Sequence, residues 1–371
     1  MAAKPAIKRP MSTTNKPSGS SVANFTTSAP ADFDGKPDLA GRHEGHPNDR
    51  HEGHPNDHHE EQLIKNRARR IVVDSMSSKL PVSDRIAAEI LHWFPKQAFS
   101  RGMGWVSRLP VPRPLRDPIY RGFSWRFGVD LGELDRPLTE FPRFDEFFCR
   151  PLPAGARTVE MAQDLLISPC DGVLSGYGQS TDGLCIHAKG QEYTVAGLLN
   201  DAELAKRYIG GEFATIYLAP HNYHRVHSPL DAQVTGYRHI PGARYPVNPL
   251  SVRTVPKLFM RNERLVTYLR GNCGSAALVM VAATGVGHIT VSYEPALSTP
   301  AGGPDRGACT YESGQEKTLR RGEELGMFHL GSTVILLFEP GRARIELPLG
   351  TPVRLGQQIG KVTLQNQGPS S

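Results

Sequence analysis

Three short segments of this 371-residue sequence hold an acid, two histidines and a serine that could act together. A serine hydroxyl becomes a nucleophile when a histidine takes its proton and an acid orients that histidine. Asp171, His227 and Ser332 supply this set, and His224 lies one short step from His227. The segments are residues 168–175 (SPCDGVLS), 223–229 (YHRVHSP) and 330–338 (LGSTVILLF).

Each segment also has a structural interpretation. Asp171 beside Gly172 is typical of a turn, a His-x-x-His pair is often structural, and Gly-Ser-Thr suits a turn that enters an apolar strand. One enzymatic alternative is a serine hydrolase that uses Ser332, His227 and Asp171 without self-cleavage, although the serine is not in a G-x-S-x-G elbow. Another alternative is a non-catalytic carrier or binding module, but Lys361 has no carrier motif around it.

The elements that would position these side chains are mainly strands. From about residue 160, short apolar runs alternate with Gly, Pro and Asn. The longest apolar run, 276–283 (AALVMVAA), has the length of a strand, so we expect no transmembrane helix. Turns at 168–175 and 350–362 resemble those of a barrel-sandwich hybrid. The predicted strands are 213–218, 277–281, 288–292, 333–338 and 343–347.

The first 60 residues differ sharply from the rest. They are rich in Pro, Ser, Thr, Gly, Asn and His and poor in large apolar residues, which predicts a disordered, His-rich tail. The heptapeptide HEGHPND at 43–49 recurs at 51–57. A slipped duplication explains this repeat better than a metal-binding tract, because a disordered tract offers no fixed coordination geometry.

Residues 61–150 are predicted to be a helical segment that associates with a membrane. Between 61 and 130 there are 13 Lys or Arg and 6 Asp or Glu, with aromatic residues among them. A helix that starts at Ser83 would place Ile86, Ile90, Trp93 and Phe94 on one side. Basic residues beside such an apolar face are typical of a helix lying in a membrane interface. The alternatives are a helix packed on its own domain and, less favoured, a surface for single-stranded nucleic acid.

The five cysteines, at 149, 170, 185, 273 and 309, are odd in number and include no C-x-x-C pair. This pattern argues against a disulfide framework and against a zinc site, and it favours a reducing compartment. From the sequence we therefore expect no metal.

Taken together, several segments resemble phosphatidylserine decarboxylases of the membrane-associated bacterial type. YHRVHSP resembles their paired-histidine signature, LGST their self-cleavage site and SPCDGVLS their acidic motif. The resemblance is collinear over roughly residues 83–362. Further matches are FFCRPL at 147–152, PGARYPVN at 241–248, VPKLFMRNER at 255–264 and GMFHLGSTVILLFE at 326–339.

The resemblance implies a proenzyme, a carboxy-lyase of phospholipid biosynthesis, that cleaves itself between Gly331 and Ser332. Asp171 would orient His227, His227 would activate Ser332, and the remnant of Ser332 would become a pyruvoyl cofactor. This group would form a Schiff base with phosphatidylserine and release CO2 to yield phosphatidylethanolamine, with His224 as the proton donor.

The resemblance also implies the following organisation. The large and small chains come from one precursor, which forms a homodimer bound peripherally to the cytoplasmic side of the cell membrane and not to nucleic acid. Composition and apolar patterning, rather than the resemblance, predict the limits of the parts. The expected fold class is α+β, with a tail at 1–60 that has no counterpart in the family pattern, the basic and aromatic helical segment at 61–150, and a β-rich, barrel-sandwich-hybrid-like catalytic domain at 151–371.

Overall fold

A computed structural model describes residues 95–181, 184–187, 191–285 and 288–365. These residues all belong to one compact unit, Ile71–Ser371. The predicted tail and the predicted helix with Trp93 and Phe94 lie outside the described residues. No helix in the described ranges is long and apolar enough to cross a membrane.

Helices come first in the described chain. The helices before the first strand are α3 (Lys96–Val106), α4 (Arg113–Phe127), η1 (Leu131–Glu133), η2 (Leu138–Glu140) and α5 (Phe144–Phe148). A small aromatic cluster holds α4 to the segment that follows it: Tyr120 stacks on Phe147, with ring centroids 4.8 Å apart, and Phe141 packs beside them. The later helices are α6 (Val195–Leu199), α7 (Ala202–Ala205), η3 (Lys206–Tyr208), α8 (Pro249–Thr254) and α9 (Leu258–Arg261).

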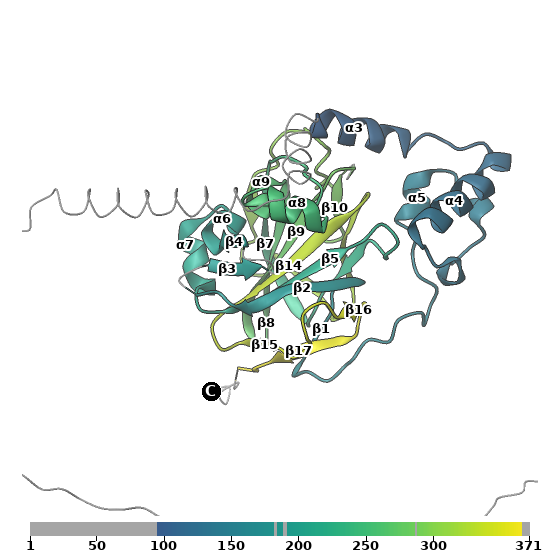
Figure 1. The fold of residues 1–371 in the computed structure, drawn as a ribbon. Helices are drawn as coiled ribbons and strands as arrows, with labels where there is room; N and C mark the ends of the chain where they lie inside the picture. The colour runs from purple at the N-terminus through teal and green to yellow at the C-terminus, as the bar shows by residue number, and fades with distance from the viewer. Residues whose placement is uncertain (1–94, 182–183, 188–190, 286–287, 366–371) are drawn as a thin grey trace, which may run out of the picture. The chain divides into compact units, whose positions relative to one another are not determined.

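The largest sheet has nine strands, and its middle is β14 (Figure 1). β14 pairs antiparallel with β5 on one side and with β9 on the other. All seven residues of β14 are buried, which suits a strand of β-branched and leucine side chains covered on both faces. The strands in order across the sheet are β11 (Ala308–Thr310), β7 (Ala232–Ile240), β8 (Arg264–Gly271), β9 (Gly274–Ala282), β14 (Ser332–Phe338), β5 (Glu212–Leu218), β2 (Gly172–Gln179) and β16 (Pro352–Val353), and β12 (Lys317–Leu319) also pairs with β7.

Three smaller sheets complete the described strands. The one beside the candidate site has the order β10 (Ile289–Val291), β13 (Glu324–Phe328) and β6 (Arg225–His227). The others are β1 (Leu165–Ile167), β17 (Gln358–Val362) and β15 (Ala343–Ile345), and the hairpin of β3 (Leu184–His187) and β4 (Gln191–Thr194).

The mixed α+β class is confirmed, and each of the five predicted strands coincides with an observed one. The strand order of the large sheet begins at β11 and ends at β16, and these two strands are not paired with each other, so the described sheet is not a closed barrel. The boundary predicted at residue 150 falls between α5 and β1, and the domain limits stay predictions.

Candidate active site

Ser332 is the first residue of β14 and lies deep inside the protein. Its backbone pairs with Leu218 on β5 and with Ala282 on β9. Its side chain has no solvent exposure, and its Oγ has no hydrogen-bond partner. A buried hydroxyl without a partner costs free energy. Thr333 Oγ1 is in the same state, so what distinguishes Ser332 is its position directly after residues with positive φ.

The backbone immediately before Ser332 is strained. Leu330 has φ of 88° and Gly331 has φ of 24°. Leucine is penalised at positive φ by about 1–3 kcal/mol, and here its buried side chain packs with Phe148 and Cys149. A Cβ on Gly331 would meet nothing within 4 Å, so conformation rather than space favours glycine there. The strain is therefore concentrated at the peptide bonds that lead into Ser332.

Asp171 lies at the same end of the sheet, two strands away. It directly precedes β2, in which Val173 pairs with Tyr217, and Tyr217 in turn pairs with Thr333. The next residue must be glycine, because a Cβ on Gly172 would lie 2.5 Å from the Tyr217 carbonyl oxygen. The register therefore sets Asp171 close to the level of Ser332 across the sheet.

Two donors hold the Asp171 carboxylate. Arg157 contacts it through Nη2 at 2.5 Å, and the Leu355 amide donates to it at 2.8 Å. Arg157 also binds Glu133 at 2.8 Å, and this hydrogen bond lowers the pKa of the Glu133 carboxyl despite its burial. Asp171 thus belongs to a buried Arg157 ion-pair network.

His227, at the end of β6, is buried with both ring nitrogens in contact. Nδ1 lies 2.9 Å from the Gly322 carbonyl oxygen, and Nε2 lies 3.1 Å from the Tyr223 hydroxyl. Because a carbonyl only accepts, Nδ1 carries the proton, and the lone pair of Nε2 accepts a hydrogen bond from the Tyr223 hydroxyl. Burial lowers the pKa of His227, so the ring is neutral and basic at Nε2. Among the described residues, no hydrogen bond joins His227 to Asp171.

His224 directly precedes β6 and is completely buried. Its Nδ1 donates to the Asn222 carbonyl at 2.8 Å, and its Nε2 has no partner. Its ring packs against Phe148, with the centroids 4.1 Å apart and the planes tilted by 42°. Burial lowers the pKa of His224 to about 3. A histidine with its ordinary pKa near neutrality could hold a donor proton at pH 7, whereas burial leaves the His224 ring neutral.

Strand pairing brings the histidines to the segment before Ser332. β6 pairs with β13, and the Phe328 amide donates to the His224 carbonyl at 3.0 Å. Phe328 is only three residues ahead of Gly331. The fold therefore gathers a strained backbone, a buried serine and two neutral histidines where β13 leads into β14.

Comparison with known proteins identifies the family of the chain. The family model described as phosphatidylserine decarboxylase matches residues 144–361. Phosphatidylserine decarboxylase proenzymes of Anaeromyxobacter sp. and Myxococcus xanthus are 44% and 42% identical to the chain, over 75% and 76% of it and 99% and 100% of their own lengths. The proenzyme of Variovorax paradoxus is 38% identical, over 76% of this chain and 99% of its own length.

The chain belongs to the phosphatidylserine decarboxylase family.

Membership in the phosphatidylserine decarboxylase family confirms the predicted family and the carboxy-lyase class. The relatives' proenzyme name agrees with processing of one precursor, and the serine hydrolase alternative is not supported. The matched range contains Asp171, His224, His227 and Ser332. Their individual roles stay predictions.

Sequence reasoning did not identify two residues that contact the predicted site residues. Arg157 lies between α5 and β1, where no periodic pattern marks its position, and only the fold shows that it binds Asp171. Tyr223 stands inside the YHRVHSP motif, so its place beside the histidines was visible, but its contact with His227 Nε2 was not.

Proposed function

We propose that this chain is a phosphatidylserine decarboxylase that cleaves itself between Gly331 and Ser332. The observation that carries the proposal is the buried, partnerless Ser332 hydroxyl directly after the strained Leu330–Gly331 pair, in a member of this family. A hydrolase serine must face an external substrate, whereas a fully buried serine suits attack on its own backbone. Incubation with vesicles that contain phosphatidylserine should yield phosphatidylethanolamine and CO2.

In the proposed self-cleavage, His227 takes the proton of the Ser332 hydroxyl at Nε2. The serine oxygen attacks the Gly331 carbonyl carbon, the peptide C–N bond breaks, and the released nitrogen takes a proton, which leaves an ester. Elimination then frees the chain 1–331 with a C-terminal carboxylate. Water replaces the nitrogen of the remaining unsaturated residue, and ammonia leaves. Asp171 would favour these steps through its negative charge near His227.

The residues at this position fit the pyruvoyl group that these steps would leave at residue 332. Two buried atoms on the converging segments, Ser332 Oγ and His224 Nε2, lack partners. A pyruvoyl group would supply the electron sink for decarboxylation. His224 Nε2 would return a proton to the substrate carbon, after the anionic substrate raises the affinity of this ring for a proton.

The proposed mechanism predicts how self-cleavage depends on pH. Protonation of His227 removes the base, and burial places its pKa below the ordinary 6.5. The cleavage rate should therefore stay constant from about pH 8 to about 6.5 and fall only in more acidic solution. Time courses of precursor made by cell-free translation, read on denaturing gels, measure this profile. A midpoint at or above pH 6.5 would contradict the assignment of His227.

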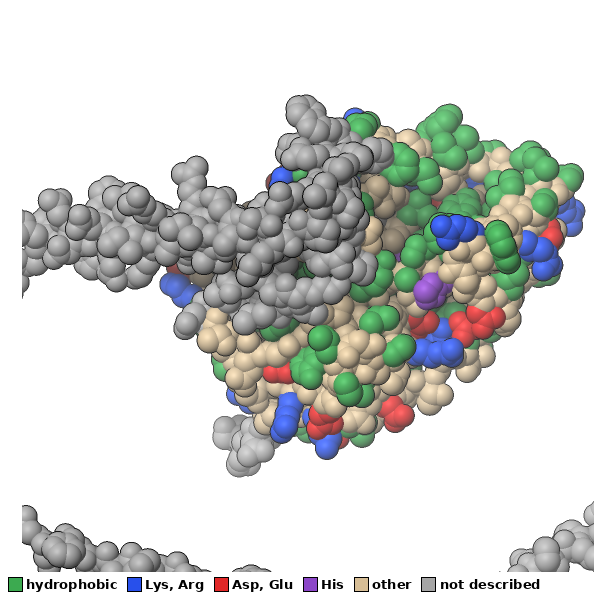
Figure 2. All heavy atoms as spheres, viewed as in Figure 1, with side chains coloured by type: hydrophobic (Ala, Val, Ile, Leu, Met, Phe, Trp, Pro, Cys, Tyr) green, Lys and Arg blue, Asp and Glu red, His purple; other side chains and the backbone are tan. Residues whose placement is uncertain are grey.

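We further propose that α3 and α4 dock the enzyme on an anionic membrane. Residues 95–128 contain seven Lys or Arg and one Asp, a net charge of +6. Figure 2 shows hydrophobic and basic side chains gathered over these helices. Trp105 is 66% exposed and Trp125 is 86% exposed, which is unusual for tryptophan. The other exposed hydrophobic residues on and between the two helices are Phe99, Val106, Leu109, Leu115, Ile119 and Phe127.

Changing both Trp105 and Trp125 to Ser should weaken binding to phosphatidylserine vesicles roughly tenfold or more, because the variant no longer has the two indole rings that would insert into the apolar part of the membrane. Self-cleavage should stay intact. Co-sedimentation with liposomes measures the effect, and high salt should weaken wild-type binding without abolishing it. The control changes two other exposed residues, Met161 and Leu349, to Ser. Equal sedimentation of wild type and the tryptophan variant would contradict docking through α3 and α4.

The resemblance to membrane-associated bacterial enzymes further supports a homodimer, peripheral attachment to the cell membrane and a position on its cytoplasmic side.

A further inference from the structure

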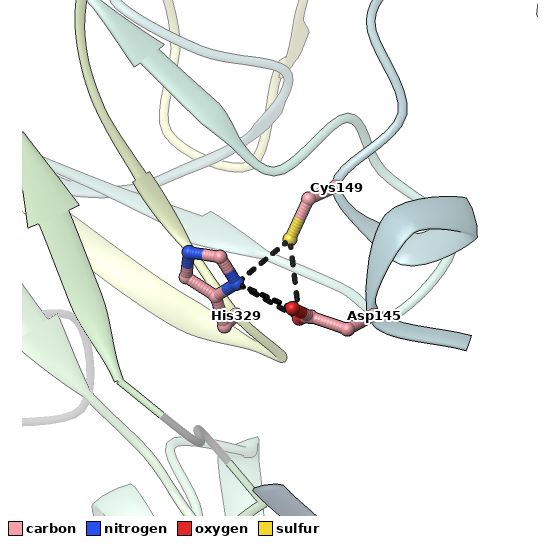
Figure 3. Close-up of side chains that lie close together, drawn as sticks. All are labelled: Asp145, Cys149 and His329. Atoms are coloured by element: carbon pink, nitrogen blue, oxygen red, sulfur yellow. Dashed lines mark hydrogen bonds and ion pairs between the residues drawn. The ribbon is translucent and has the colours of Figure 1, made fainter. Parts of the chain in front are cut away.

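Three side chains with metal-binding atoms converge beside the proposed cleavage segment (Figure 3). Asp145 lies on α5, and Cys149 caps the C-terminal end of this helix one turn later. His329 directly precedes Leu330. His329 Nδ1 lies 2.8 Å from Asp145 Oδ1 and 3.6 Å from Cys149 Sγ. The Cys149 sulfur lies 3.7 Å from the same carboxylate oxygen.

These separations approach those of a tetrahedral metal site. Zinc bonds of the usual lengths to sulfur, nitrogen and oxygen set neighbouring ligand atoms about 3.3–3.6 Å apart. The sulfur–nitrogen distance of 3.6 Å falls at the upper end of this range, the sulfur–oxygen distance of 3.7 Å lies just above it, and the nitrogen–oxygen distance of 2.8 Å would lengthen as an ion entered. A thiolate and a carboxylate together balance the charge of a divalent cation.

The surroundings orient the histidine as a metal ligand requires. In the ion-free structure His329 Nδ1 donates to the Asp145 carboxylate, and a bound ion would take the place of that proton. His329 Nε2 lies 3.2 Å from the Thr290 hydroxyl, which can accept the proton that the metal-bound ring carries on Nε2. The His288 ring stacks on the His329 ring with centroids 3.5 Å apart. Arg108 Nη2 lies 2.5 Å from Nδ1 of His288. The His329 ring is thus fixed on its face and at its second nitrogen.

We propose that Asp145, Cys149 and His329 bind one Zn²⁺ ion, with water as the fourth ligand. The Asp145 and His329 side chains are 15% and 13% exposed, so solvent reaches the cluster. Binding would displace the thiol proton of Cys149 to solvent. The ion would tie α5 to the segment 328–331. If the proposed cleavage at Gly331 occurs, this segment becomes the new C-terminus of the large chain, and the ion would hold it in place.

The absence of a C-x-x-C pair led to the expectation of no metal. That expectation considered ligands that are neighbours in sequence, whereas this cluster joins Cys149 to a histidine 180 residues later. It also differs from the His-rich repeats at 43–57, which contain no cysteine.

Cobalt(II) tests the site in the full-length protein. Co²⁺ bound to a thiolate gives a sulfur-to-metal charge-transfer absorption that histidine and carboxylate ligands do not give. Titration of wild type should reach one such site per chain, and added Zn²⁺ should abolish the band. The tail histidines cannot produce this signal, because the first cysteine of the chain is Cys149.

Variants assign the ligands. Cys149→Ser should lose the charge-transfer band, and His329→Gln and Asp145→Asn should bind Co²⁺ at least tenfold more weakly. Cys309→Ser, which changes a more exposed free cysteine, should keep the wild-type band. Zn²⁺ should raise the unfolding temperature of wild type and not that of Cys149→Ser. If Cys149→Ser does not fold, His329→Gln provides the same comparison.

A wild-type protein without the charge-transfer band would overturn the site, and so would a band that persists in both Cys149→Ser and His329→Gln. The uncleaved Ser332→Ala chain should show the same band, because all three ligands precede residue 332. If the proposed self-cleavage fails, the cobalt titration still tests the metal site. If the metal site fails, the cleavage assays still test the proposed function.

Discussion

Replacing Ser332 with Ala should leave the chain as a single species of 40.7 kDa without decarboxylase activity. The variant has no hydroxyl to attack the Gly331 carbonyl, and no cofactor can form from alanine. The fold should persist, because Ser332 Oγ makes no hydrogen bond that would be lost. A denaturing gel and a phosphatidylserine decarboxylation assay measure the two losses.

Thr333 provides a matched control. Its Oγ1 is also buried without a hydrogen-bond partner, on the next residue of the same strand. Thr333→Val removes this hydroxyl and keeps the shape of the side chain, so the variant should fold and cleave normally. Cleavage of Ser332→Ala, or loss of cleavage in Thr333→Val with the fold retained, would contradict a specific role for the Ser332 hydroxyl.

Replacing each of the two buried histidines should affect a different step of the proposed mechanism. His227→Ala should abolish self-cleavage, because the Ser332 proton then has no acceptor. His224→Ala should still cleave at least partly, but its decarboxylation should fall about 10²-fold or more, since the proton donor is missing. Densitometry of denaturing gels measures the first effect, and CO2 release per cleaved chain measures the second.

His221 is a suitable control, because it is an exposed histidine close to both positions in the sequence. His221→Ala should behave as wild type in both assays. Normal cleavage by His227→Ala would show that another group is the base. Normal decarboxylation by cleaved His224→Ala would remove His224 from the proton-return step.

Much of the sheet could be predicted, because apolar runs bounded by Gly, Pro and Asn reflect local chemistry. The run 333–338 became β14, and 276–283 falls within or just beyond β9. The segments that carry Asp171, the histidines and Ser332 could be found in the same way, since each is a short contiguous pattern. Their meeting at one end of the sheet follows from the pairing of β6 with β13 and from the register of β2, β5 and β14.

What the sequence could not provide depends on contacts between distant residues. Arg157 binds Asp171 from a loop. Burial beside Phe148 lowers the pKa of His224 to about 3, well below the ordinary value near neutrality. The strain at Leu330 is visible only in the backbone angles. His329 meets Asp145 across 184 residues, so no spacing rule could join them.

Intact-mass spectrometry of purified wild-type protein tests the central claim most directly. Self-cleavage between Gly331 and Ser332 should give two chains, one ending at Gly331 and one of 40 residues from position 332 to 371. The small chain should be lighter by one ammonia than a peptide that begins with serine, because its first residue carries a ketone in place of the amine and hydroxyl. A single intact chain in a preparation that decarboxylates phosphatidylserine, or a small chain that begins with unmodified serine, would show that Ser332 is not converted into a pyruvoyl group.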